Sequence, residues 1–254
     1  MSFAEEIFLA MRHYGDAIKL VRKHKMFPLL FVSFFLFLLI LAACGFGIYQ
    51  GNNALIEWIM NISWVKQWNT FFEDAPWVIS IFKIGINIAT FFLFISFYKF
   101  VFLALASPLY AFISEKGAEK YKGVTYPFVW SQFLKDIIRG IRISIRNLFK
   151  QLLLTLLLFI LSFIPVIGFV FAFLILMLDA YYYGFAMLDY CTERDKKTVG
   201  QSIRWIKDHR GLALGNGLIF YASMVLLPIL GVIFIAPISA IAAMISYFHI
   251  TEKT

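Results

Sequence analysis

The stretch FIPVIG (residues 163–168) breaks a long apolar segment, and LLPILG (residues 226–231) breaks a second one in the same way. Proline cannot continue a helix, and a glycine three residues later is typical of a turn. No polar residue accompanies either break. The two segments therefore predict two helical hairpins, at about 152–190 and 212–250, whose tips are marked by Pro165, Gly168, Pro228 and Gly231.

The composition places the chain in a membrane. Hydrophobic residues make up 61% of the 254 positions and charged residues only 15%, which is more apolar surface than a soluble domain of this length can bury. Two further apolar blocks, 27–49 and 77–107, are long enough to cross the roughly 30 Å of hydrocarbon as single helices. The first 25 residues are amphipathic and mixed in charge, so we expect them to be retained rather than cleaved as a signal peptide.

The distribution of Lys and Arg predicts the topology. Five lie in residues 1–26, one in 50–76, eight in 108–150 and six in 191–211. By the positive-inside rule the N-terminus is cytoplasmic and both hairpins start and finish on the cytoplasmic side. Their first arms reach only about 20 and 24 Å, so we expect re-entrant hairpins that stop inside the bilayer. Two ordinary spanning hairpins with tight outer turns are the alternative.

The expected fold class is therefore an all-α integral membrane protein. It would consist of two long transmembrane helices, two re-entrant (hemi-penetrating) helical hairpins and cytoplasmic amphipathic helices, in a single membrane domain over residues 1–254. Glycines in RGLALGNG (residues 210–217) predict close helix approach in the second hairpin. Asn87, in the second long helix, is expected to hold a neighbouring helix.

Several cations lie where they would meet an anion at the membrane surface. Arg22, Lys23 and Lys25 directly precede the first span, and Arg210 begins the second hairpin. Backbone N–H groups at nearby helix ends would add to the attraction for sulfate or phosphate. We take these four as candidate anion-binding residues, with an ordinary positive-inside anchor as the alternative.

A basic helix face precedes the first hairpin. Five cations recur there at helical spacing, with isoleucines on the opposite face: Lys135, Arg139, Arg142, Arg146 and Lys150. Such a helix lies along the interface and binds anionic lipid headgroups. The alternative is a vestibule that gathers an anionic solute.

Two carboxylates lie in the second arm of the first hairpin. Asp189 is near the interface, where Arg194 or another cytoplasmic base would pair with it. Asp179 lies deeper, where a carboxylate needs a cationic partner, a proton or a water-filled cavity. For Asp179, structural pairing and a role in transport stay open.

Signals for an enzyme are absent from the sequence. It contains no nucleotide-binding loop, no HExxH and no Gly-x-Ser-x-Gly. Cys44 and Cys191 predict neither a disulfide nor a metal site. We expect no cofactor, no metal and no nucleic-acid partner.

The sequence resembles the CysZ family of bacterial sulfate permeases. The similarity is carried by SPLYAFISEKGAEK (107–120), LSFIPVIG (161–168), the block from Leu188 to Gly217, and LLPILGVIFIAPISAIAA (226–243). The resemblance implies two full-length helices with two hemi-penetrating hairpins, oligomeric assembly, and sulfate uptake for cysteine synthesis across the cytoplasmic membrane. It also implies a Gly-Leu-Arg sulfate motif before the first span, where this chain reads RKHKMF (22–27).

Together these observations favour a transporter or channel for a small oxyanion, sulfate in particular. The homo-oligomer and the cysteine-synthesis role are expectations from the resemblance. The alternative function is a non-transporting membrane scaffold that shapes the bilayer or binds a partner.

Overall fold

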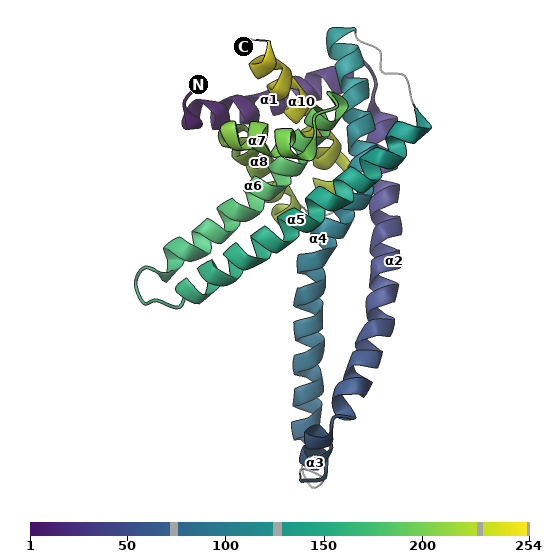
Figure 1. The fold of residues 1–254 in the computed structure, drawn as a ribbon, viewed down its shortest axis with the longest axis vertical. Helices are drawn as coiled ribbons and strands as arrows, with labels where there is room; N and C mark the ends of the chain where they lie inside the picture. The colour runs from purple at the N-terminus through teal and green to yellow at the C-terminus, as the bar shows by residue number, and fades with distance from the viewer. Residues whose placement is uncertain (72–75, 124–128, 228–230, 253–254) are drawn as a thin grey trace. The chain divides into compact units, whose positions relative to one another are not determined.

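A computed structural model describes residues 1–71, 76–123, 129–227 and 231–252 of the chain. Over these ranges all regular structure is helical, which confirms the all-α prediction (Figure 1). The elements, in chain order, are α1 (Phe3–Lys23), α2 (Phe27–Met60), α3 (Ser63–Phe71), α4 (Pro76–Lys122), α5 (Trp130–Leu161), α6 (Gly168–Arg194), α7 (Val199–Asp208), α8 (Arg210–Leu226), the π-helix η1 (Gly231–Ile235) and α10 (Ala236–Thr251).

The chain forms two compact units. One comprises Leu38–Phe102, which is most of α2, all of α3 and the first part of α4. The side chain of Asn52 in α2 donates to Asn87 Oδ1 in α4 at 2.6 Å, which confirms that Asn87 holds a neighbouring helix. Both predicted long helices are present and longer than expected, since α2 continues to Met60 and α4 continues through Pro108 to Lys122.

The other unit comprises Met1–Phe37 and Leu103–Thr254. Its core is formed by α8 and α10, which pack with α1 and α6. Small residues make this possible. A Cβ at Gly217 would lie 1.7 Å from the Ala180 carbonyl oxygen of α6, and a Cβ at Gly215 would lie 2.4 Å from the Ile7 carbonyl oxygen of α1. The close helix approach predicted for these glycines is thus confirmed.

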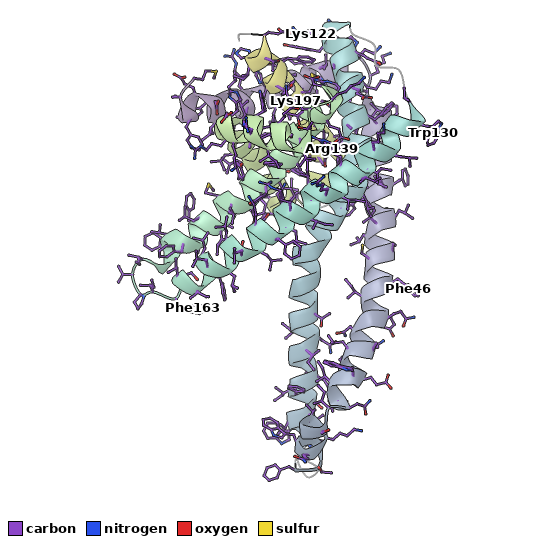
Figure 2. The ribbon with its side chains drawn as sticks, viewed as in Figure 1. Phe46, Lys122, Trp130, Arg139, Phe163 and Lys197 are labelled. Atoms are coloured by element: carbon purple, nitrogen blue, oxygen red, sulfur yellow. The ribbon has the colours of Figure 1, made fainter. Side chains whose placement is uncertain are left out.

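The first hairpin is formed by α5 and α6, which run antiparallel from a tip at residues 162–167 (Figure 1). At Gly168 a Cβ would lie 2.0 Å from the Ser162 carbonyl oxygen, so only glycine allows the chain to re-enter a helix here. Val166 has a φ of 73°, a left-handed value that is unfavourable for a β-branched residue. Figure 2 shows Phe163 at this tip, 73% exposed.

Helix α5 joins two segments that we expected to be separate. The basic amphipathic face and the first arm of the hairpin lie on one continuous helix that begins at Trp130. Within the described residues, three helical segments are long and apolar enough to cross a membrane: α2, residues 137–161 of α5, and α6.

The second hairpin is built differently. Its arms, α8 and α10, contact each other, and α10 is buried from Ala236 to Tyr247. Gly231 starts η1 and packs against Ser223, whose carbonyl oxygen a Cβ would approach to 2.9 Å. The predicted tip residue Pro228 lies outside the described residues.

Candidate anion pocket formed by α1, α4 and α10

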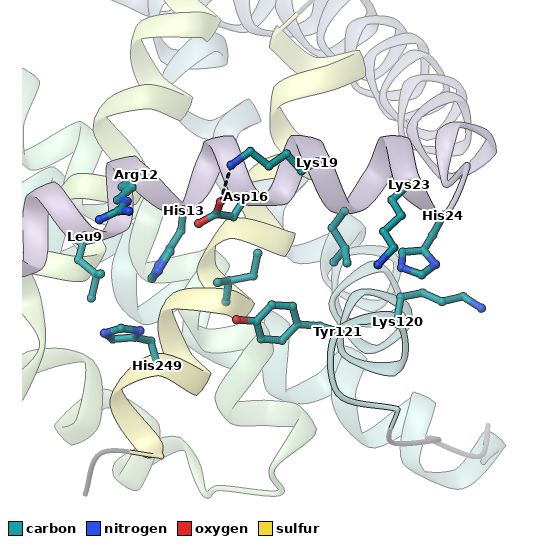
Figure 3. Close-up of a pocket in the computed structure, with 12 residues that line it drawn as sticks. Leu9, Arg12, His13, Asp16, Lys19, Lys23, His24, Lys120, Tyr121 and His249 are labelled. Atoms are coloured by element: carbon teal, nitrogen blue, oxygen red, sulfur yellow. Dashed lines mark hydrogen bonds and ion pairs between the residues drawn. The ribbon is translucent and has the colours of Figure 1, made fainter.

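A cavity of about 560 Å³ opens between α1, the C-terminal part of α4 and α10 (Figure 3). It lies within one compact unit. Three of the chain's four histidines line it, together with four Lys or Arg side chains. The lining residues are Leu9, Arg12, His13, Asp16, Lys19, Leu20, Lys23, His24, Lys120, Tyr121, Ile245 and His249. We refer to this cavity as the basic pocket.

Helix α1 supplies most of the wall. Its N-terminus is fixed by a capping box in which Ser2 and Glu5 bond reciprocally. Ala10, Ala17 and Val21 on one face are buried, and Tyr14 donates to the Asn216 carbonyl oxygen at 2.7 Å. This packing fixes the rotation of α1, so the residues at its edge face the pocket.

His13 forms the buried base of the pocket. It is 5% exposed, its Nδ1 is 2.8 Å from Ser246 Oγ, and its ring centre is 5.5 Å from that of His249. Burial, followed by the neighbouring His249, lowers the pKa of His13 from 6.5 to about 4. The Ser246 hydroxyl donates to the Ala242 carbonyl oxygen, so we assign the His13 proton to Nδ1 and a free acceptor to Nε2.

The charge of the pocket is strongly positive. Arg12, Lys19, Lys23 and Lys120 face a single carboxylate, Asp16, which pairs with Lys19 at 3.2 Å. The Lys and Arg side chains are all exposed, so their charged ends reach the cavity from solvent. A concave surface with several charged donors and one acid suits a small anion.

Of the four predicted anion-binding residues, only Lys23 lines the basic pocket. Arg22 and Lys25 are exposed beside it, and Lys25 has a φ of 51° in the turn that ends α1. Arg210 is exposed at the start of α8 and does not line this pocket. The structure therefore does not bring the four residues together.

Sequence reasoning missed most of the pocket. Lys120, Tyr121 and His249 reach it only through the packing of distant helices, which no local pattern reveals. The contribution of α1 did carry a signal. Its charged residues lie at positions 12, 16, 19 and 23, a spacing that places them on one helix face.

Asp189 has the predicted ion pair, and its partner is Arg139. The two guanidinium nitrogens donate to its carboxylate oxygens at 2.8 and 2.9 Å, and Glu193 accepts from the same guanidinium at 3.0 Å. Ser202 of α7 also donates to Asp189. The assignment of Arg139 to a lipid-facing surface was wrong, because this side chain is only 13% exposed and fastens α5 to α6 (Figure 2).

Asp179 has two neutral hydrogen-bond partners. Gln151 of α5 donates to its carboxylate, and Tyr221 of α8 also forms a hydrogen bond with it. The carboxylate therefore links the first hairpin to the second. Amide and phenol donors thus stabilise this half-buried carboxylate.

Among the described residues, no group of three His, Cys, Asp or Glu side chains is arranged to hold a metal ion. Cys44 and Cys191 are both free thiols.

The family model "Sulfate transporter CysZ/Etoposide-induced protein 2.4" matches residues 14–236. A protein from Pseudomonas fluorescens Pf-5, named sulfate transporter CysZ, is 30% identical over 54% of this chain and 56% of its own length. The namesake from P. fluorescens Pf0-1 is 25% identical over 73% of each chain, and that from P. aeruginosa PAO1 is 22% identical over 87% of each. The chain thus spans just over half the length of the first relative.

The matched residues include α1 from Tyr14 onward, both long helices, the first hairpin and α8. They include the pocket residues from Asp16 to Tyr121, whereas Leu9, Arg12 and His13 of α1 and Ile245 and His249 of α10 lie outside the match. Because the match covers most of the sequence, the chain belongs to the family of the sulfate transporter CysZ and etoposide-induced protein 2.4.

Proposed function

We propose that this protein carries a small oxyanion, sulfate in the first instance, across the bacterial cytoplasmic membrane, and that the basic pocket is where the ion binds. The observation that carries the proposal is the gathering of Arg12, Lys23 and Lys120 from two helices around one cavity. Membership of a sulfate transporter family supports it, as do α2, α5 and α6, which are long and apolar enough to cross a membrane.

The chemistry of the pocket fits an ion of this class. Sulfate at neutral pH carries two charges and accepts hydrogen bonds without donating any. Arg12 offers a planar pair of donors, Lys23 and Lys120 offer mobile ammonium groups, and Tyr121 offers a hydroxyl. A cavity of about 560 Å³ also leaves room for water beside the ion, so it need not be fully dehydrated.

The proposal places the pocket at the cytoplasmic mouth of the path. It retains the cytoplasmic N-terminus and two re-entrant hairpins in a single membrane domain, with the hairpin tips lining or gating the path. The excess of Lys and Arg in residues 1–26, 108–150 and 191–211 supports this orientation. The uncharged tip of the first hairpin, with Val166 87% exposed, fits an apolar surrounding.

Three finer features belong to the same proposal. The protein would work as a homo-oligomer and supply sulfate for cysteine synthesis. The exposed cations Lys135 and Arg142 of α5 would face anionic lipid headgroups. A scaffold without transport is the competing function, and the exposed apolar hairpin α5–α6 is the observation that favours it.

The test is uptake of radiolabelled sulfate into proteoliposomes, with excess sulfite, phosphate or chloride as competitors. Wild type should show saturable flux that empty liposomes lack. Arg12→Gln and Lys23→Gln should each reduce sulfate affinity by at least about tenfold, because each removes a charged hydrogen-bond donor. Lys135→Gln, which removes an exposed cation outside the pocket, should leave uptake unchanged.

An absence of flux from folded, reconstituted protein would contradict the transport proposal and favour the scaffold. Equal flux in wild type, Arg12→Gln and Lys23→Gln would support transport but contradict the assignment of the basic pocket as the binding site.

A further inference from the structure

A second group of cations lies away from the basic pocket, on the helices α5, α7 and α8, each of which packs on α6. Arg146 and Lys150 belong to α5, Lys207 to the last turn of α7, and Arg210 to the start of α8. Lys150 lies within electrostatic range of both Arg146 and Lys207. Tyr181 of α6 lies within range of Arg146 and Arg210. We call these four cations the hairpin-base cluster.

The packing of α5 on α6 explains why these residues meet. Arg139 bonds to Asp189, and Gln151 bonds to Asp179, so the two helices run antiparallel in a fixed register. Arg146 lies two turns beyond Arg139 and therefore near the same face, about 10 Å further toward the tip. It consequently comes to lie beside Tyr181 and Tyr182.

The position of α8 places Arg210 in the cluster. Gly184 of α6 approaches the Ala213 carbonyl oxygen so closely that a Cβ would lie 1.8 Å from it. Arg210 begins α8 one turn before Ala213, next to the end of α7. Three separate helices thus bring positive charge to one place.

In the described part of the chain, no carboxylate pairs with the cluster in the way that Asp189 pairs with Arg139. Among the residues that the structure describes, none of its four members forms an ion pair. Arg146 donates to the neutral Asn147 side chain at 2.7 Å, and Lys150, Lys207 and Arg210 are exposed. The nearest acid in sequence is the exposed Asp208. Like charges held together in this way attract an external anion.

The surface next to the cluster identifies the class of anion. Lys150 is the last charged residue of α5 before the tip, and the helix continues as an uncharged run whose Leu153 is 71% exposed. On α6, the corresponding surface contains Phe173, 54% exposed. A phosphate group on the cations would therefore have its acyl chains alongside an apolar helical pair, which a free inorganic anion cannot use.

We infer that the hairpin-base cluster of Arg146, Lys150, Lys207 and Arg210 is a specific site for the phosphate of an anionic phospholipid, whose acyl chains lie along α5 and α6. In this inference Arg210 binds a lipid, whereas the transported ion binds in the basic pocket. The site is also more specific than the general attraction of lipid headgroups to the exposed cations of α5. The inference does not depend on sulfate transport.

The test is native mass spectrometry of the full protein in detergent, titrated with phosphatidylglycerol, with phosphatidylcholine, and with inorganic phosphate. The variant Lys150→Gln/Lys207→Gln removes two cations that come from different helices. It should bind phosphatidylglycerol about 30-fold more weakly at the tightest site, because each Lys or Arg near an anionic lipid surface contributes roughly a factor of five. Phosphatidylcholine should bind weakly to both proteins.

The matched control is Lys135→Gln/Arg142→Gln, which removes two exposed cations from α5 outside the cluster. It should retain the tight phosphatidylglycerol. Equal losses in the two double variants would overturn the site in favour of general charge attraction. Binding of inorganic phosphate that displaces phosphatidylglycerol would show a site for a free anion and would also overturn the lipid assignment. Thermal unfolding of each variant verifies that it is folded.

Discussion

The two hairpins share a Pro-x-x-Gly motif, yet their arms are buried to different extents in the structure. In α5–α6 the arms end in exposed leucines and phenylalanines, such as Leu153 and Phe163. In α8 and α10 apolar residues away from the tip, such as Phe220 and Ile241, are almost fully buried, and exposure is confined largely to the end of α8, where Leu226 is 76% exposed. The motif therefore predicts a turn and says nothing about what surrounds the arms.

Small residues account for the difference. The second hairpin carries RGLALGNG in one arm and APISAIAA in the other, and these allow backbones to touch α1 and α6. Between residues 152 and 161 the first arm is nearly all Leu, Ile and Phe, whose bulk keeps neighbouring helices apart. The second hairpin thus forms the core of its unit, and the first projects an apolar surface.

The largest effect should come from a side chain added to the second hairpin. Gly217→Leu places a Cβ 1.7 Å from the Ala180 backbone, so α8 must separate from α6. We expect a loss of about 4 kcal/mol in the free energy of unfolding, or no folded protein. Gly45→Ala in α2, where a Cβ meets nothing within 4 Å, should stabilise slightly. Thermal unfolding in detergent measures both, and an unchanged Gly217→Leu would contradict the close contact.

The base of the first hairpin should be the next most sensitive place. Asp189→Asn removes the carboxylate that accepts from both guanidinium nitrogens of Arg139, while the ion pair with Glu193 remains. The expected cost is about 3 kcal/mol, because a largely buried ion pair loses one of its two carboxylates. Chemical unfolding followed by tryptophan fluorescence gives the value. Arg142→Gln on the same helix is exposed and should cost less than about 0.5 kcal/mol.

The contact between α1 and the second hairpin should depend on pH through His13. Its pKa is about 4 when folded against 6.5 when unfolded. The unfolded chain therefore binds the proton more readily, and stability that is present above pH 6.5 is lost as the pH falls toward 4. His13→Gln should flatten this dependence. Unfolding temperatures at pH 7.5, 6.0 and 4.5 test it, and parallel curves for both proteins would rule out His13 as the source.

The smallest effect should come from the exposed tip of the first hairpin. Val166→Gly relieves a φ of 73° that is unfavourable for valine. We expect stabilisation by about 1 kcal/mol, since the strain removed exceeds the added chain entropy. Ile164→Gly, which has no positive φ to relieve, should not stabilise. Equal shifts in unfolding temperature for both variants would show that strain at Val166 is not the cause.

The sequence predicts the all-helical class, both long helices, the turn at 163–168 and the glycine contacts, because each depends on local periodicity or residue size. It does not predict that α5 is one continuous helix from Trp130. A basic face followed by an apolar arm is compatible both with one helix and with two. The partner of Asp189 and the pocket residues Lys120 and His249 depend on long-range packing. These contacts join residues far apart in the chain and leave no local pattern.

The central claim is that the basic pocket binds a small oxyanion, and isothermal titration of the purified protein with sulfate tests it most directly. Wild type and the Lys135→Gln control should bind sulfate equally, while Arg12→Gln/Lys23→Gln should weaken binding by about a hundredfold, since two charged donors are lost. Sulfate affinity that is the same in all three proteins would contradict the claim.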